Sequence, residues 1–135
     1  MRVLVDTSVW SLALRKKLKT INEQKIVNQF SKILRDLKLV IIGPIRQEIL
    51  SGISNKNRFE ELKEKISVFE DLPLESKDYE LAAELFNKCR SKGIQGSHID
   101  FLICSVAINY KLKILTLDKD FEKYQKYLPI KLERI

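Results

Sequence analysis

The stretch RVLVDTSVW, residues 2–10, decides the fold class of this 135-residue chain. Residues 2–5 are apolar enough to form a short buried strand, and Asp6 ends that run. Asp6 and the two hydroxyl residues behind it are all types that begin helices, so a helix is expected over residues 9–16. A buried strand that leads directly into a helix is typical of α/β proteins with a parallel sheet.

The same alternation of strand and helix continues along the rest of the chain. A capping box at residues 20–23 predicts the start of the next helix, and Pro44 is well placed in the first turn of another. Strands are expected at residues 2–5, 39–42, 113–117 and 130–132, and further helices at residues 55–64, 78–90, 99–110 and 121–127. Residues 66–72 are ambiguous, with a short strand as one possibility. With no linker or repeat, the sequence predicts one α/β domain over residues 1–135.

The composition is that of a soluble globular protein, with 44% apolar and 32% charged residues. No apolar run approaches the roughly 20 residues that cross a membrane, so no membrane association is expected. Residues 1–14 lack the pattern of a secretory signal, which makes the cytoplasm the expected compartment. Cys89 and Cys104 lie among apolar neighbours in predicted helices and are expected to be buried thiols.

Positive charge is concentrated near the N-terminus. The chain carries a net charge of +7, and residues 15–38 hold eight Lys and Arg but only two acidic residues. Such a cluster favours a polyanionic partner such as nucleic acid. A solvated, lysine-rich helix face would give the same pattern, so both interpretations remain open.

Four acidic residues lie where an apolar core is expected. Asp6 and Asp118 each follow a predicted strand, Asp100 opens the apolar helix at residues 99–110, and Glu48 is expected at the start of the helix that begins at Pro44. Strand ends and helix starts face the same edge of a parallel sheet, so the four side chains can converge there. Taken singly, Asp6 fits a helix cap, Asp100 a helix cap, Asp118 a turn and Glu48 a helix surface. A carboxylate at a core edge is costly unless it is hydrogen-bonded, paired or bound to a metal.

A cluster of carboxylates without Cys or His ligands favours Mg²⁺ or Mn²⁺ over zinc. Such ions activate water and stabilise the charge that develops at phosphorus, while Lys and Arg hold the phosphate backbone. The sequence therefore predicts metal-dependent phosphodiester hydrolysis. Thr7, Ser8 and Thr116 could orient the carboxylates or water, and Asp120 fits a helix cap or a supporting acid.

Four segments resemble the motifs of PIN-domain ribonucleases, in particular the VapC-like toxins of toxin–antitoxin pairs. The similar segments are Val5-Asp6-Thr7-Ser8-Val9-Trp10, the helix at residues 44–50 that carries Glu48, residues 99–107 behind Asp100, and Thr116-Leu117-Asp118-Lys119-Asp120-Phe121. Their order and spacing cover the whole chain. Cys104-Ser105 stands where the family often has two alanines, which affects packing only.

The resemblance implies a three-layer α/β/α sandwich that cuts single-stranded or loop RNA with Mg²⁺ or Mn²⁺. It implies Asp6, Glu48, Asp100 and Asp118 as catalytic residues, the three aspartates as metal ligands, and Asp120 in support. It also implies a homodimer and a cognate antitoxin that blocks the site. A metal-dependent DNA nuclease or phosphatase and a PIN-like RNA-binding module remain the alternatives; the module is disfavoured because no acid is missing.

Two surface features follow from this interpretation. Lys16, Lys17 and Lys19 are expected to bind the RNA backbone rather than to select a sequence, because phosphate contacts carry little sequence information. An exposed apolar strip near the first helices is expected to receive the antitoxin and to make the free protein dimeric, with Trp10, Leu12 and Leu14 as candidates.

Overall fold

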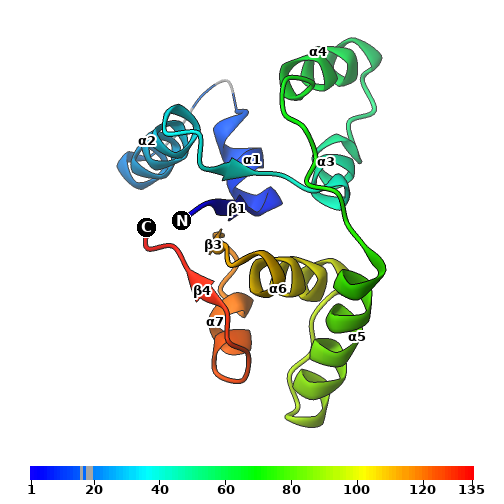
Figure 1. Cartoon of the computed structure of the whole chain (residues 1–135). Coiled ribbons are helices and arrows are strands. Elements are labelled where there is room, and N and C mark those ends of the chain that lie inside the picture. The colour runs from blue at the N-terminus through cyan, green and yellow to red at the C-terminus, as the bar shows by residue number, and fades with distance from the viewer. Residues whose placement is uncertain (16, 18–19) are drawn as a thin grey trace.

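The structure is a computed structural model that describes residues 1–15, 17 and 20–135. A parallel sheet of four strands lies at its centre, and helices flank it to form a three-layer α/β/α sandwich (Figure 1). The predicted fold class is therefore confirmed. In the view of Figure 1, helices α3 and α4 lie at the upper right, and α5 and α6 at the lower right.

The sheet consists of short strands in the order β2-β1-β3-β4. They are β1 (Val3–Val5), β2 (Leu39–Val40), β3 (Lys113–Leu115) and β4 (Lys131–Leu132). All pairs are parallel, and Val3 lies opposite both Leu39 and Lys113. All four strands therefore end at the same edge, where β1 and β3 are direct neighbours.

Seven helices are assigned within the described residues. They are α1 (Thr7–Ala13), α2 (Ile21–Arg35), α3 (Gly43–Leu50), α4 (Lys56–Ile66), α5 (Ser76–Ser91), α6 (His98–Tyr110) and α7 (Asp120–Gln125). The capping box predicted before α2 is confirmed, because the Thr20 side chain accepts from Glu23 N–H and the Glu23 side chain accepts from Thr20 N–H. Helix α6 is buried almost all round, from Phe101 to Ala107.

Several predicted boundaries were wrong. Helix α1 begins at Thr7 and ends at Ala13 rather than covering residues 9–16, so it follows Asp6 directly. The region 66–72 forms no strand, since α4 runs to Ile66 and only Asp71 pairs with the sheet, through Ile41. Helix α3 begins at Gly43, which places Glu48 nearer its end than its start.

Two of the three residues predicted to form an exposed apolar strip near the first helices, Trp10 and Leu12, are buried instead. Trp10 is 1% exposed and packs edge-on against Phe30 and Phe69, with ring centroids 5.0 and 5.3 Å away. Leu12 is also buried, and Leu14 is half-buried. The prediction failed because α2 and the segment behind α4 both pack on α1, so the side of α1 that carries Trp10 faces the core.

Two further expectations about the chain can be compared with the structure. Cys89 and Cys104 are free, buried thiols, as predicted. Burial, with the negative charge of Asp100 and the proximity of Cys89 adding to it, raises the pKa of the Cys104 thiol far above its usual range. Among the described residues, no helix has both the length and the apolar character to cross a membrane.

Candidate active site

Asp6 lies at the end of β1, with 7% of its surface exposed. Its backbone N–H donates to Leu115 of β3 (2.9 Å), and its carbonyl accepts from the first turn of α1. Its side chain makes no capping bond. Instead, Oδ2 accepts hydrogen bonds from Ser8 Oγ and Thr116 Oγ1, each at 2.8 Å. Asp6 thus occupies the N-cap position while its carboxylate is turned toward the loop behind β3.

The two hydroxyls that hold Asp6 also fix the loop that carries Asp118. Ser8 Oγ accepts from Leu117 N–H, and Thr116 Oγ1 accepts from Asp118 N–H, both at 3.0 Å. The bond from Leu117 to Ser8, like the one from Thr116 to Asp6, joins residues more than 100 positions apart because β1 and β3 are adjacent strands. The ends of the two strands therefore behave as one hydrogen-bonded unit.

Asp118 and Asp120 have different surroundings. Asp118 Oδ1 accepts from Asp120 N–H (2.9 Å), so this carboxylate also anchors the start of α7. The Asp120 carboxylate instead lies 3.3 Å from Lys123 Nζ, one turn along the helix. Asp120 therefore contributes its backbone to the position of Asp118, while its side chain forms an exposed ion pair.

Asp100 enters the same region from the first turn of α6. The Ser97 side chain caps this helix by accepting from Asp100 N–H (3.1 Å), and Tyr124 Oη donates to Asp100 Oδ2 (2.7 Å). Burial raises the pKa of the Asp100 carboxyl above its ordinary value; the bonds from Tyr124 and Ser97 oppose this, and the charges of Asp118 and Asp6 reinforce it. The structure thus brings Asp6, Asp100 and Asp118 within mutual electrostatic influence.

The structure does not join every candidate residue to this group. Glu48 is exposed on α3, and within the described part of the chain no hydrogen bond or ion pair links it to the three aspartates. Thr7 Oγ1 is buried without a partner among the described residues, so it does not orient a carboxylate here. Lys17 is exposed, while Lys16 and Lys19 lie outside the described residues.

The donor set fits a hard divalent cation in chemistry and in charge. Three carboxylates share one partly buried edge, where burial, reinforced by the charges of Asp118 and Asp6, raises the pKa of the Asp100 carboxyl. Across the described residues, however, no three His, Cys, Asp or Glu side chains form a ready-made metal cage. Mg²⁺ does not require one, because it commonly binds through one or two carboxylates and keeps several waters.

A cleft opens beside Asp118 at this edge of the sheet. It has a volume of about 900 Å³, and residues 116–119 form one side of it while residues 131–135 form another. Lys119, Lys131 and Arg134 line it together with Glu122 and Glu133. The carboxyl edge of the sheet is therefore accessible to a ligand larger than a water molecule.

Three residues that shape the site were not predicted from the sequence: Tyr124, Gly96 and Ser97. Tyr124 of α7 is fully buried, and burial, its bond to Asp100 and the nearby acids raise the pKa of its phenol far above the usual range, so it remains a donor. Gly96 lies against the Tyr124 ring. Only Ser97 left a signal in the sequence, since Ser-x-x-Asp before an apolar run marks a helix start.

The whole-chain comparisons agree with this architecture. The crystal structure of FitAcB from Neisseria gonorrhoeae is 19% identical, with a TM-score of 0.77 over 98% of this chain and 96% of that one. VapBC2 from Rickettsia felis, bound to a DNA fragment from its promoter, is 21% identical, with a TM-score of 0.77 over 98% of both chains. VapBC-5 from Mycobacterium tuberculosis, a member of the VapBC toxin–antitoxin family, is 17% identical, with a TM-score of 0.69 over 100% of both chains. These similarities establish the fold.

Sequence comparison supplies the family. Among curated proteins, none matches this chain. The family model of the PIN domain matches residues 3–127, which include all four predicted acidic positions and both strands that carry Asp6 and Asp118. PIN domains form a family of nuclease type. The chain therefore belongs to the PIN-domain family.

Proposed function

We propose that this chain is a single-domain, Mg²⁺- or Mn²⁺-dependent endoribonuclease and the toxin of a toxin–antitoxin pair. The observation that carries the proposal is that Asp6, Asp100 and Asp118 lie at one edge of the sheet, with an open cleft beside Asp118. Similar structures that belong to toxin–antitoxin complexes support the biological role. The cytoplasm, which contains the RNA, is its proposed compartment.

The proposed roles follow from the contacts of each residue. Asp6, Asp100 and Asp118 would hold the cation, and Ser8 and Thr116 would keep the Asp6 carboxylate in place through the bonds described above. When bound, the cation supplies an activated water and stabilises charge at phosphorus. Glu48 is retained as a catalytic candidate on the strength of the family motif alone, since it lies exposed in the second half of α3.

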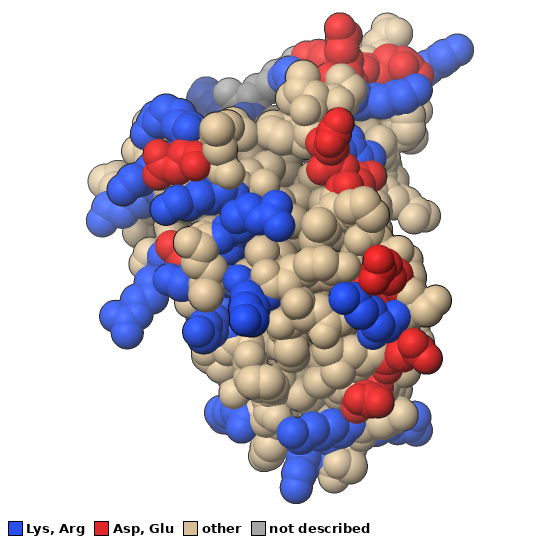
Figure 2. Space-filling model, in the orientation of Figure 1, with Lys and Arg blue, Asp and Glu red and all other residues tan. Residues whose placement is uncertain are grey.

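A basic surface beside α2 supports a polyanionic substrate, and the resemblance to PIN-domain ribonucleases makes RNA the proposed one. Figure 2 shows Lys and Arg side chains gathered on the side of the molecule that carries α2 and β4. On α2, Lys25, Lys32 and Arg35 are exposed. Together with the predicted contacts of Lys16, Lys17 and Lys19, this surface would hold the phosphate backbone, and binding would weaken steeply as salt is added.

The catalytic proposal is tested with carboxylate variants on three substrates. Asp6→Asn or Asp100→Asn is expected to reduce RNA cleavage to background while the thermal midpoint stays the same or rises, because removing one carboxylate relieves repulsion among the others. Glu122→Gln, an exposed residue in the cleft beside Asp118, serves as the control. RNA, single-stranded DNA and a phosphomonoester are compared with and without EDTA.

Each result of this assay has a defined meaning. Cleavage of RNA alone, lost in EDTA and in both Asn variants, supports the proposal. Cleavage of DNA or of the phosphomonoester in preference to RNA assigns the site to the alternative enzymes. RNA binding without cleavage would identify a binding module, and full cleavage in EDTA would exclude the metal mechanism.

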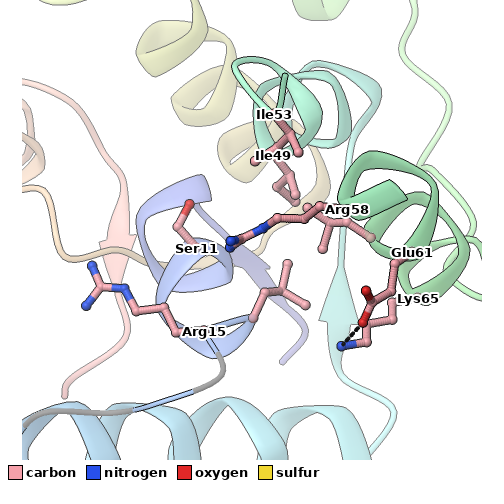
Figure 3. A pocket seen from close by; sticks show the side chains of 9 residues that line it. Ser11, Arg15, Ile49, Ile53, Arg58, Glu61 and Lys65 are labelled. Carbon is pink, nitrogen blue, oxygen red and sulfur yellow. Dashed lines mark ion pairs between the residues drawn. The ribbon is translucent and has the colours of Figure 1, made fainter. Parts of the chain in front are cut away.

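A groove between α1, α3 and α4 supports the antitoxin proposal (Figure 3). Its volume is about 210 Å³. Apolar side chains form its floor, and Arg15, Arg58 and Lys65 lie at its rim with Glu61, which pairs with Lys65 at 3.8 Å. The apolar floor is formed by Leu14, Ile49, Ile53 and Leu62. An amphipathic segment with acidic side chains would match this surface.

Co-expression tests the antitoxin proposal. The chain is expected to arrest growth when expressed alone, and the product of an adjacent gene is expected to relieve the arrest. Ile53→Asp should still arrest growth but escape relief, because a charge in the groove blocks docking. Val68→Asp, at a position 77% exposed and not among the groove residues, should remain subject to relief. If the wild-type chain is harmless, the toxin role is excluded while the nuclease can stand.

A homodimer is proposed through a second apolar surface. A hollow of about 510 Å³ lies between α3, α5 and α6, with Tyr79 on its rim 54% exposed. Phe86 stacks on His98 within it, with ring centroids 5.0 Å apart. Burial of such aromatic side chains is characteristic of the centres of protein interfaces.

A further inference from the structure

The hydrogen bond from Tyr124 to Asp100 links the site to a helix that carries no ligand. Tyr124 lies in α7 and is completely buried, and its Oη donates to Asp100 Oδ2 at 2.7 Å. Its ring packs against Phe101 and Phe121, with centroids 4.9 and 5.2 Å away. The phenol is therefore held on both sides while its hydroxyl reaches one carboxylate oxygen.

Gly96 makes this position of Tyr124 possible. A Cβ atom built on Gly96 would overlap Tyr124 Oη and the ring carbon that bears it, and would also press on the Phe101 ring. No larger residue fits at position 96 unless the phenol moves. The loop before α6 thus passes close to the hydroxyl and leaves it little freedom to turn away from Asp100.

We propose that Tyr124 is a positioning residue for the cation site, and that Gly96 provides the space in which it acts. By occupying Oδ2 of Asp100, the phenol fixes the rotation of the carboxylate and leaves its remaining lone pairs for the cation. A carboxylate held in place by a hydrogen bond loses less entropy on binding an ion than one that rotates freely. Asp6 is held by two hydroxyls in the same manner, so two of the three aspartates are fixed by side-chain hydroxyls.

This inference rests on the proposed role of Asp100 as a cation ligand, and its test separates the two. Binding of Mn²⁺ is measured without RNA, from the electron paramagnetic resonance signal of the free ion, in wild type, Tyr124→Phe and Asp100→Asn. Tyr127→Phe is the control, because Tyr127 lies just behind the same helix and is exposed. Tyr124→Phe removes one oxygen atom and keeps the ring that packs on Phe101.

Tyr124→Phe is expected to weaken Mn²⁺ binding by roughly 10- to 100-fold, while Tyr127→Phe binds as wild type does. In the cleavage assay, Tyr124→Phe should recover activity as Mn²⁺ is raised, with an unchanged KM for RNA, whereas Asp100→Asn should not recover. Gly96→Ala retains the phenol but places a methyl group where the Tyr124 hydroxyl lies, so this variant should also bind Mn²⁺ more weakly than wild type.

The results that would overturn the positioning role differ from those that would overturn the proposed function. If wild type binds Mn²⁺ and Asp100→Asn does not, but Tyr124→Phe binds as tightly as wild type, the positioning role is excluded and the proposed function stands. A lower thermal midpoint with unchanged Mn²⁺ affinity would also exclude it, because the hydroxyl would then serve packing alone. If Asp100→Asn binds Mn²⁺ as wild type does, the proposed function fails at its ligand.

Discussion

At the scale of single residues, the hydrogen-bond partners of a buried acid distinguish a structural role from a chemical one. Asp6 occupies an N-cap position, yet its carboxylate accepts from Ser8 and Thr116 rather than from the helix. Asp78 is the opposite case. It is fully buried, and its carboxylate accepts from Glu75 N–H at the start of its own helix and from Asn109 Nδ2 and Tyr110 Oη of α6, so its bonds cap α5 and join it to α6. Burial alone therefore does not identify a catalytic acid.

Asp78 should make the stability of the protein depend on pH. Burial would raise the pKa of its carboxyl, but the bonds from Glu75, Asn109 and Tyr110 and the charge of Lys77 outweigh it and hold the pKa below the usual 3.8. A lowered pKa in the folded state adds stability that is fully present above the unfolded pKa and is lost as the pH falls toward the folded one. Asp78→Asn should cost about 1–3 kcal/mol at neutral pH, and the difference should shrink in acid.

Urea unfolding from about pH 7 to about pH 3 measures this difference. Glu80→Gln, an exposed acid on the same helix, is the matched control and should follow wild type. A gap between wild type and Asp78→Asn that stays constant through the acid range would show that the charged form of the carboxylate contributes nothing.

At the scale of elements, the sequence predicted those helices and strands whose formation depends on neighbouring residues, and not those that depend on residues far along the chain. The capping box at Thr20 and the buried helix behind Asp100 follow from neighbouring residues, and both were predicted. The segment behind α4 was not, because Arg46 of α3 organises it by donating to the carbonyls of Ile66 and Phe69 and to the Asp71 carboxylate. No pattern within residues 66–72 reports a guanidinium that lies 20 or more positions earlier.

The same distinction between local and distant causes applies to the candidate site. The positions of Asp6 and Asp118 at strand ends could be predicted, because a parallel sheet aligns all its carboxyl ends at one edge. The bond from Tyr124 to Asp100 could not, since it depends on the angle at which α7 meets α6 and on the absence of a side chain at Gly96. Likewise, the burial of Trp10 depends on Phe30 and Phe69, which approach from two distant segments.

At the scale of the whole molecule, the proposed dimer places α5 at a boundary between two copies. Tyr79→Glu should weaken self-association at least about 100-fold, because it puts a charge where an aromatic side chain would be buried. Light scattering after size exclusion, over a range of protein concentrations, measures the change. Tyr127→Glu, at a residue 38% exposed and outside the hollow, is the control. Equal dimerisation of wild type and Tyr79→Glu would place the interface elsewhere.

The adjacency of β1 and β3 has a consequence for the time at which the protein becomes active. Asp6 is synthesised well before its partner, because the Thr116 hydroxyl that holds it lies 110 residues later in the chain. The strand that leads to Asp118 takes its place in the sheet between β1 and β4, which is the last strand in the chain. A nascent chain can pair β1 with β2 early and still lack a complete site. The sheet order thus delays the assembly of the three-aspartate cluster until the residues of β3 and the loop behind it have been synthesised, however early β1 pairs with β2.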